Sequence, residues 1–279
     1  DRNGEVHAHL LALICRHGRL FPPYLYTHGR VYGEGEYAPG EDRELLFSMM
    51  LKAVTQKFNH KLCLYIEFSD ISNKMFAYRH FRQNGYFPIP WQEIHNSLHS
   101  LPPEKRISEK ALSKIETAEK HGVYTREAES EKELGAFYKQ LRSYFRFKTR
   151  RSIPHRKMFS MLNSEGDSKT FVTIYKNKII GGCVCLYSGK NAYMWYLASK
   201  RKTYIHLSPA SITVWAAIKY AYTHGYEHIY FLDAGLPFRN NPFREFILSF
   251  GGKPVSKYRW FRLPVPYINR FLSWCYNDK

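Results

Sequence analysis

Two side chains capable of proton transfer stand next to predicted secondary-structure boundaries. Asp233 ends the run 228–232, which predicts a strand, and α/β sheets bind ligands at the carboxyl ends of their strands. His206 lies just before a predicted helix. We expect Asp233 to hold or deprotonate an amine and His206 to act as a base or to contact a phosphate. The plainer alternatives stay open: Asp233 as a loop cap, and His206 without a chemical role.

Aromatic and cationic side chains accompany these two residues. Tyr193 and Trp195 lie two positions apart in a predicted strand, so they share one face and could stack on a substrate or pack in the core. Arg239 and Arg244 follow the strand of Asp233. Their guanidinium groups could clamp a phosphate or carboxylate with paired hydrogen bonds, or lie solvated on the surface.

The cysteines and histidines predict neither a disulfide framework nor a metal centre. The five cysteines are odd in number and irregularly spaced, and no His/Cys cluster has metal-ligand spacing. We therefore expect no metal, small buried thiols and a reducing compartment. The cysteines are Cys15, Cys63, Cys183, Cys185 and Cys275.

The charge is strongly positive. Forty-two Lys and Arg residues against 24 Asp and Glu give a net charge of +18, which attracts polyanions such as RNA, anionic lipid surfaces and the phosphates of CoA. Three clusters carry much of this charge, and each could face a ligand or simply be solvated surface. They are the basic residues of 142–157, the run Lys200, Arg201 and Lys202, and the basic residues of 253–262.

The chain is long enough for two ordinary domains. Its 279 residues are 44% hydrophobic, a globular balance. It has no run of about 18 apolar residues and no basic-then-apolar leader pattern at its start, so we expect neither a membrane span nor a secretory signal. Because the chain does not begin with Met, we allow for residues upstream of Asp1.

Periodicity and turn signals predict a mixed α/β chain. In the first half we expect a strand over 6–15, a Gly-rich loop over 31–37, a helix over 41–57, a strand over 62–68 and a helix over 75–83. A charged helix over 104–121 marks the boundary. The expected organisation is a first half at 1–103, a connecting helix at 104–122 and a second domain at 123–279.

The second half has a clear predicted order. From residue 123 it reads strand, helix, helix, strand, strand, strand, helix, strand, helix, strand, and the three consecutive strands are joined by short turns as a meander. Ser130 and Glu133 form a capping box for the first of these helices. Ser208 and Pro209 predict an N-cap and first turn for the third helix. A terminal amphipathic helix over 266–276 follows.

This order resembles the GNAT acyltransferase fold, and four stretches resemble the FemAB-related acyltransferases, which pair two GNAT-like domains. The resemblance covers most of the chain, more loosely in its first half through 24–37 and 79–88. The four stretches are the charged helix 110–122 leading into 123–126, the helix opened by 207–210 and ending at 221–226, the strand end 231–235, and 242–246 with the Phe-Gly-Gly at 250–252.

The resemblance implies tandem GNAT-like domains whose mixed central sheets are flanked by helices. It implies a sheet that opens between the third meander strand and the strand after the long helix, with the acyl donor in that split. The implied activity is N-acyl transfer from acyl-CoA or aminoacyl-tRNA to an amine, such as a cell-wall precursor of peptidoglycan or an amino sugar. It also implies a bacterial cytoplasmic protein, free or peripheral at the inner membrane face.

Two departures from the family pattern bear on the donor. Acyl-CoA-dependent members hold the pyrophosphate on a Gly-containing loop, but the matching stretch 199–208 has no glycine. The helix start at Ser208 and the cations of Lys200–Lys202 could hold an anion instead. Bridge-forming members carry Lys after the motif Phe, whereas here Ile247 follows Phe246. The alternative is a catalytically inactive module that binds RNA or another polyanion.

Overall fold

The computed structural model describes residues 4–19, 24–145 and 153–277 and divides the chain into two compact units. Unit 1 is Asp1–Trp91 with Ser256–Lys279, and unit 2 is Gln92–Val255. This division differs from the expected boundaries in two ways. The end of the chain joins unit 1 because Trp260 pairs with Phe68 in the sheet. Residues 92–122 join unit 2, where Ile115 lies in the core.

Unit 1 contains a mixed sheet in the strand order β1-β2-β3-β10. Strands β2 and β3 are parallel, and the other neighbouring pairs are antiparallel. Stacking of Phe81 on Trp260, at 4.5 Å between ring centroids, lies at the centre of its aromatic core. Its elements are β1 (Ala8–Arg19), β2 (Tyr24–Tyr37), α1 (Arg43–His60), β3 (Ile66–Ser69), α2 (Tyr78–Gln83), the later part of β10 (Lys253–Arg262) and α8 (Pro266–Asn277).

The expected Gly-rich loop over 31–37 is the end of strand β2. Gly33 and Gly35 have φ angles of +71° and +88°, and the pairing register with β1 shifts between His9 and Leu11. The glycines therefore form a β-bulge inside a long strand, where positive φ would strain any other residue.

The strands of unit 2 have mixed directions and lie in the order β4-β9-β8-β7-β6-β5. The predicted succession from residue 123 is confirmed, and strand β4 precedes it without having been predicted. Its elements are β4 (Phe87–Ser97, entering from unit 1), α3 (Glu109–Lys120), β5 (Tyr124–Glu127), α4 (Glu131–Phe145), α5 (Arg156–Ser164), β6 (Ser168–Tyr175), β7 (Lys178–Ser188), β8 (Asn191–Ser199), α6 (Pro209–Thr223), β9 (His228–Gly235) and α7 (Pro242–Leu248).

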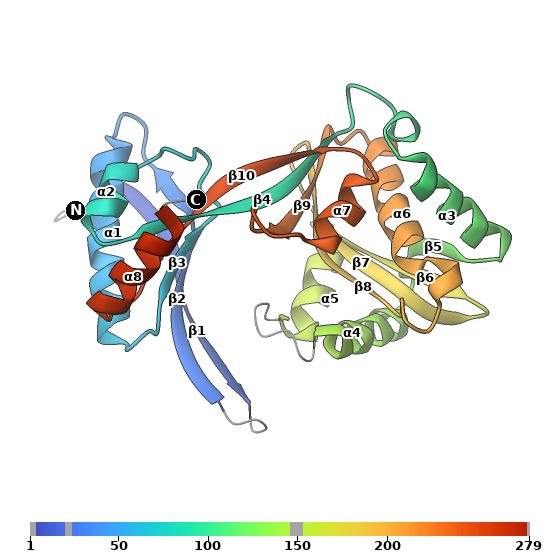
Figure 1. The fold of residues 1–279 in the computed structure, drawn as a ribbon, viewed down its shortest axis with the longest axis horizontal. Helices are drawn as coiled ribbons and strands as arrows, with labels where there is room; N and C mark the ends of the chain where they lie inside the picture. Colours follow the sequence, from blue (N-terminus) through green and yellow to red (C-terminus); the bar gives the residue numbers. More distant parts are fainter. Residues whose placement is uncertain (1–3, 20–23, 146–152, 278–279) are drawn as a thin grey trace. The chain divides into compact units, whose positions relative to one another are not determined.

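Helices cover both faces of the unit 2 sheet (Figure 1). Alternate residues of the three meander strands β6–β8 point to opposite faces of the sheet. Phe171 and Cys183 pack with α3 and α6 on one face, whereas Val172 and Val184 pack with α4 and α5 on the other. This alternation follows from the period of two along a strand. Because both faces are covered, β6 and β7 are buried along most of their length, and the middle of β7 reads as a continuous apolar run. The expected fold class, mixed sheets flanked by helices, is confirmed.

Several local predictions have a direct structural outcome. The Ser130 hydroxyl accepts a hydrogen bond from the Glu133 amide at the start of α4, as the capping box predicts. All five cysteines are free thiols, and Cys183 and Cys185 are fully buried. Among the described residues, no helix has the length and hydropathy needed to cross a membrane. In the basic run 142–157, Arg146, Lys148, Arg150 and Arg151 lie outside the described residues.

Candidate functional site

The sheet of unit 2 opens between β8 and β9. The two strands pair in parallel over four positions, from Asn191 opposite His228 to Met194 opposite Phe231. Beyond these positions β8 stays paired with β7 as far as Ser199, while β9 stays paired with β4 as far as Gly235. The strands therefore separate at the place where the resemblance implies a split for the donor.

Asp233 lies in a distortion of β9 at the mouth of this split. Phe231 pairs with Ile94 and Gly235 with Gln92, so residues 232–234 stand opposite the single residue Glu93. Asp233 itself has a φ of +65°, in the left-handed region that non-glycine residues rarely adopt. A strained backbone conformation persists only where the surrounding structure holds it in place, and such residues cluster at functional sites.

The loop after β9 is held by the side chains of Asn241 and Arg244. Asn241 caps α7 and donates from Nδ2 to the carbonyl oxygen of Ala234 at 2.8 Å. A Cβ on Gly235 would lie 2.4 Å from that same Nδ2 atom, so a side chain at this position would break the contact. Arg244 donates to Gln92 Oε1 at 2.8 Å and to the Leu236 and Arg239 carbonyl oxygens at 2.9 Å each.

These contacts change the interpretation of the two arginines that we expected to clamp an anion. Arg244 is only 9% exposed, and its guanidinium group donates to Gln92 of β4 and to two carbonyl oxygens of the loop that follows Asp233. It positions that loop instead of presenting its charge to a ligand. Arg239 is exposed at the surface of the loop, so its side chain is accessible to an anion.

A polar and aromatic row crosses the sheet beside the split. His95 on β4 is opposite Tyr230 on β9, and Tyr230 is opposite Tyr193 on β8. The Tyr193 and Tyr230 rings stack at 5.1 Å between centroids, and the His95 ring meets Tyr230 edge-on at 4.5 Å. The Glu93 Oε2 atom lies 3.0 Å from His95 Nε2. Of these residues only Tyr193 was predicted from the sequence.

The row contains a buried carboxylate paired with an imidazole. Glu93 is 6% exposed and pairs with the imidazole of His95, so a buried carboxylate orients an imidazole. Burial raises the pKa of the Tyr230 hydroxyl, with smaller contributions from Tyr193 and Glu93, so Tyr230 stays a neutral hydrogen-bond donor.

The segment between β8 and α6 presents cations at the start of a helix. Lys200, Arg201 and Lys202 form an exposed turn, and His206 is exposed in the short 3-10 turn Ile205–Leu207. Ser208 is the N-cap residue of α6, but it has a φ of +42° and its side chain makes no capping hydrogen bond. The expected side-chain cap is therefore wrong, because the left-handed backbone directs the hydroxyl away from the first helical amides.

The two remaining predicted contact residues pack among aromatic neighbours. Trp195 lies 5.5 Å from Phe159 of α5 and 4.8 Å from Tyr196, between ring centroids. Phe246 packs edge-on against Phe250 at 5.3 Å, against the core beneath α6. Both side chains are half-buried, so each contributes mainly to the packing of unit 2.

Comparisons with known proteins agree with this geometry. No curated protein matches the chain in sequence. Residues 105–240 match the family described as acetyltransferase (GNAT) domain. Three solved structures are similar in fold along nearly the whole chain.

The C-terminal domain of a candidate lysylphosphatidylglycerol synthetase from Agrobacterium fabrum has a TM-score of 0.63 at 10% identity, over 96% of this chain and 88% of that one. FemX has a TM-score of 0.62 at 12% identity, over 98% and 89%. The L-PGS of Bacillus licheniformis has a TM-score of 0.61 at 12% identity, over 98% and 90%. Together with the split sheet, the family match shows that this chain contains a GNAT-superfamily acetyltransferase domain at residues 105–240.

Proposed function

We propose that the chain is an N-acyltransferase that binds its acyl donor in the β8–β9 split of unit 2. The observation that carries this proposal is the parallel ladder that ends after four positions, with the Glu93–His95 pair beside it. The ladder lies inside residues 105–240, which match the GNAT domain family, whose fold is associated with acyl transfer, and the Glu93–His95 pair lies on β4, before the matched range. The match supports the reaction class, and the arrangement of side chains supports the roles below.

Acyl transfer to an amine requires three things from these residues. The amine must lose a proton, the two reactants must be aligned, and the oxyanion that forms on the donor carbonyl must receive a hydrogen bond. In our proposal His95, oriented by Glu93, accepts the proton of the amine. Asp233 holds the amine, and the hydroxyls of Tyr193 and Tyr230 are the hydrogen-bond donors available to the oxyanion.

The donor carries phosphate groups, as acyl-CoA or as aminoacyl-tRNA. The exposed run Lys200–Lys202 and His206 stand just before the N-terminus of α6, where a helix dipole favours an anion. The name of one similar structure supports the aminoacyl version, since lysylphosphatidylglycerol contains a lysyl group. The net charge of +18 supports a large anionic donor as well.

The first experiment is a titration of the purified protein with acetyl-CoA, longer acyl-CoAs and charged tRNA at several salt concentrations. If tRNA is the donor, affinity falls steeply with salt because each phosphate contact releases counterions. Replacing Lys200–Lys202 by Gln should then lower the salt slope by about 2 to 3. The matched control replaces Lys110, Lys114 and Lys120 of α3 by Gln, which removes the same charge elsewhere on unit 2 and should leave the slope unchanged.

A second candidate function is a catalytically inactive module that binds RNA or another polyanion. It is favoured by the glycine-free segment 199–208 and by Ile247 after Phe246. In such a module, Asp233→Asn leaves binding intact and there is no reaction to abolish. Measurable transfer of an acyl group by the wild type would exclude this candidate, whereas salt-dependent RNA binding without any transfer would support it.

A further inference from the structure

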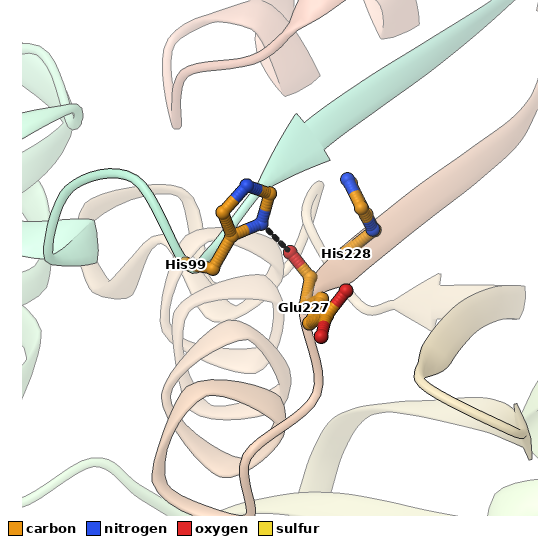
Figure 2. Close-up of side chains that lie close together, drawn as sticks. All are labelled: His99, Glu227 and His228. Atoms are coloured by element: carbon orange, nitrogen blue, oxygen red, sulfur yellow. Dashed lines mark hydrogen bonds between the residues drawn. The ribbon is translucent and has the colours of Figure 1, made fainter.

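Two histidines and a glutamate meet at the end of the unit 2 sheet that lies away from the split. His228 is the first residue of β9, Glu227 precedes it, and His99 follows β4 (Figure 2). One ligand atom from each of the three side chains lies within 4.8 Å of the others. The sequence predicted no metal because His99 and Glu227 are 128 positions apart, a separation that matches no metal-ligand motif.

The backbone that carries these side chains is held on several sides. The Glu227 carbonyl oxygen accepts from the Leu98 amide at 2.7 Å, and the Glu227 amide donates to the Lys190 carbonyl oxygen at 2.8 Å. His228 pairs with Ser97 of β4 and with Asn191 of β8. The His99 Nδ1 atom lies 3.2 Å from the Glu227 carbonyl oxygen, which keeps this ring over the start of β9.

We infer that His99, Glu227 and His228 form a binding site for a divalent transition metal of the zinc class. Two imidazoles and one carboxylate are a ligand set that Zn²⁺ accepts in proteins, with water in the fourth position. At metal–ligand distances of about 2.0–2.1 Å, tetrahedral ligand atoms stand roughly 3.4 Å apart. His99 is exposed, so the ion has an open approach, and we expect the His99 ring to rotate toward the other two ligands when the ion binds.

A neighbouring lysine should lower the affinity of the site for a metal ion. Lys190 Nζ lies 2.5 Å from Glu227 Oε1, so this ammonium competes with a bound cation for the carboxylate. A carboxylate has two oxygens, so Lys190 can keep Oε1 while Oε2 binds the ion. Removing the lysine charge should therefore strengthen metal binding, while removing any of the three ligands should weaken it.

The position of the site indicates its role. His228 begins β9, and its ring stacks on Tyr230, a proposed oxyanion donor, at 5.8 Å between ring centroids. Asp233 stands near the other end of the strand, so the metal would not hold the amine there. It would instead join the end of β4 to the start of β9, two strands far apart in the chain. Binding to the folded state alone stabilises that state by mass action. The inference does not depend on the proposed acyltransferase activity.

The test is calorimetric titration of the full chain, without a histidine tag, with Zn²⁺, and with Co²⁺ monitored by its visible absorption. We expect one equivalent to bind, an affinity loss of about 100-fold or more in His228→Gln or Glu227→Gln, and a gain in Lys190→Met. His121→Gln, an exposed histidine on α3's C-terminal end, is the control and should bind as the wild type does.

The inference is overturned if the wild type binds Zn²⁺ no more tightly than the triple variant H99Q/E227Q/H228Q, or if Lys190→Met weakens binding. Thermal unfolding of the same proteins guards against misfolded variants. Each variant should unfold as the wild type does in the presence of a chelator, and Zn²⁺ should raise the unfolding temperature only of proteins that keep the three ligands.

Discussion

Replacing Arg244 should destabilise unit 2 without weakening the attraction of a phosphate donor. The side chain is 9% exposed and makes three hydrogen bonds of 2.8–2.9 Å to Gln92, Leu236 and Arg239. A hydrogen bond to a charged group contributes about 1.5–3 kcal/mol net. In the variant Arg244→Met the two loop carbonyls can turn toward water. We therefore expect this variant to lower the free energy of unfolding by about 3–5 kcal/mol, which is less than the sum for three separate hydrogen bonds.

The matched control is Arg239→Met, which removes the same charge five residues earlier from an exposed position. It should change the stability by no more than about 0.5 kcal/mol. Hydrogen exchange of peptides from β9 and α7 measures this stability separately from that of unit 1. If Arg244→Met is as stable as the control but loses about one unit of salt slope in donor binding, then Arg244 is a phosphate ligand and our reasoning is wrong.

Two further predictions concern the backbone near Asp233 and the core of unit 1. Gly235→Ala should destabilise unit 2 by about 2 kcal/mol more than Gly122→Ala in urea unfolding, because both glycines have similar positive φ angles but only Gly235 faces the Asn241 amide. His28 is buried, and burial lowers its pKa to about 4, with smaller effects of neighbouring cations. Below pH 6.5 the unfolded chain binds a proton that the folded His28 does not, so stability should fall between pH 6.5 and 4 and level off above pH 7. His28→Phe should flatten this dependence in thermal unfolding; an unchanged slope would contradict it.

The sequence was sufficient for most of the second half of the fold because its signals are local. Helix α4 begins after Ser130, whose hydroxyl accepts from the Glu133 amide, and the short turns of the meander fix three adjacent strands. These features depend on residues a few positions apart. The succession of helices and strands from residue 123 could therefore be predicted without knowledge of the long-range contacts, and its resemblance to the GNAT fold supplied the fold class.

Strand β4 was missed because Pro88 and Pro90 lie in its first half, and proline is uncommon within strands. Glu93 and His95 lie in this strand and were missed with it, because their importance depends on the pairing of β4 with β9, more than 130 residues later. Conversely, Arg244 reads in sequence as an exposed cation after a strand, and only the loop contacts show that it is buried. The boundary of unit 1 depends on a similar long-range pairing, between β10 and β3.

The central claim is that the Glu93–His95 pair beside the split promotes acyl transfer. The direct measurement is single-turnover transfer from the donor found by titration to an amine, with wild type and Glu93→Gln compared at saturating donor. We predict transfer by the wild type, a rate about 10²–10⁴-fold lower in the variant, and the same donor affinity in both. An unchanged rate in Glu93→Gln, or no transfer by the wild type with any donor, would contradict the account.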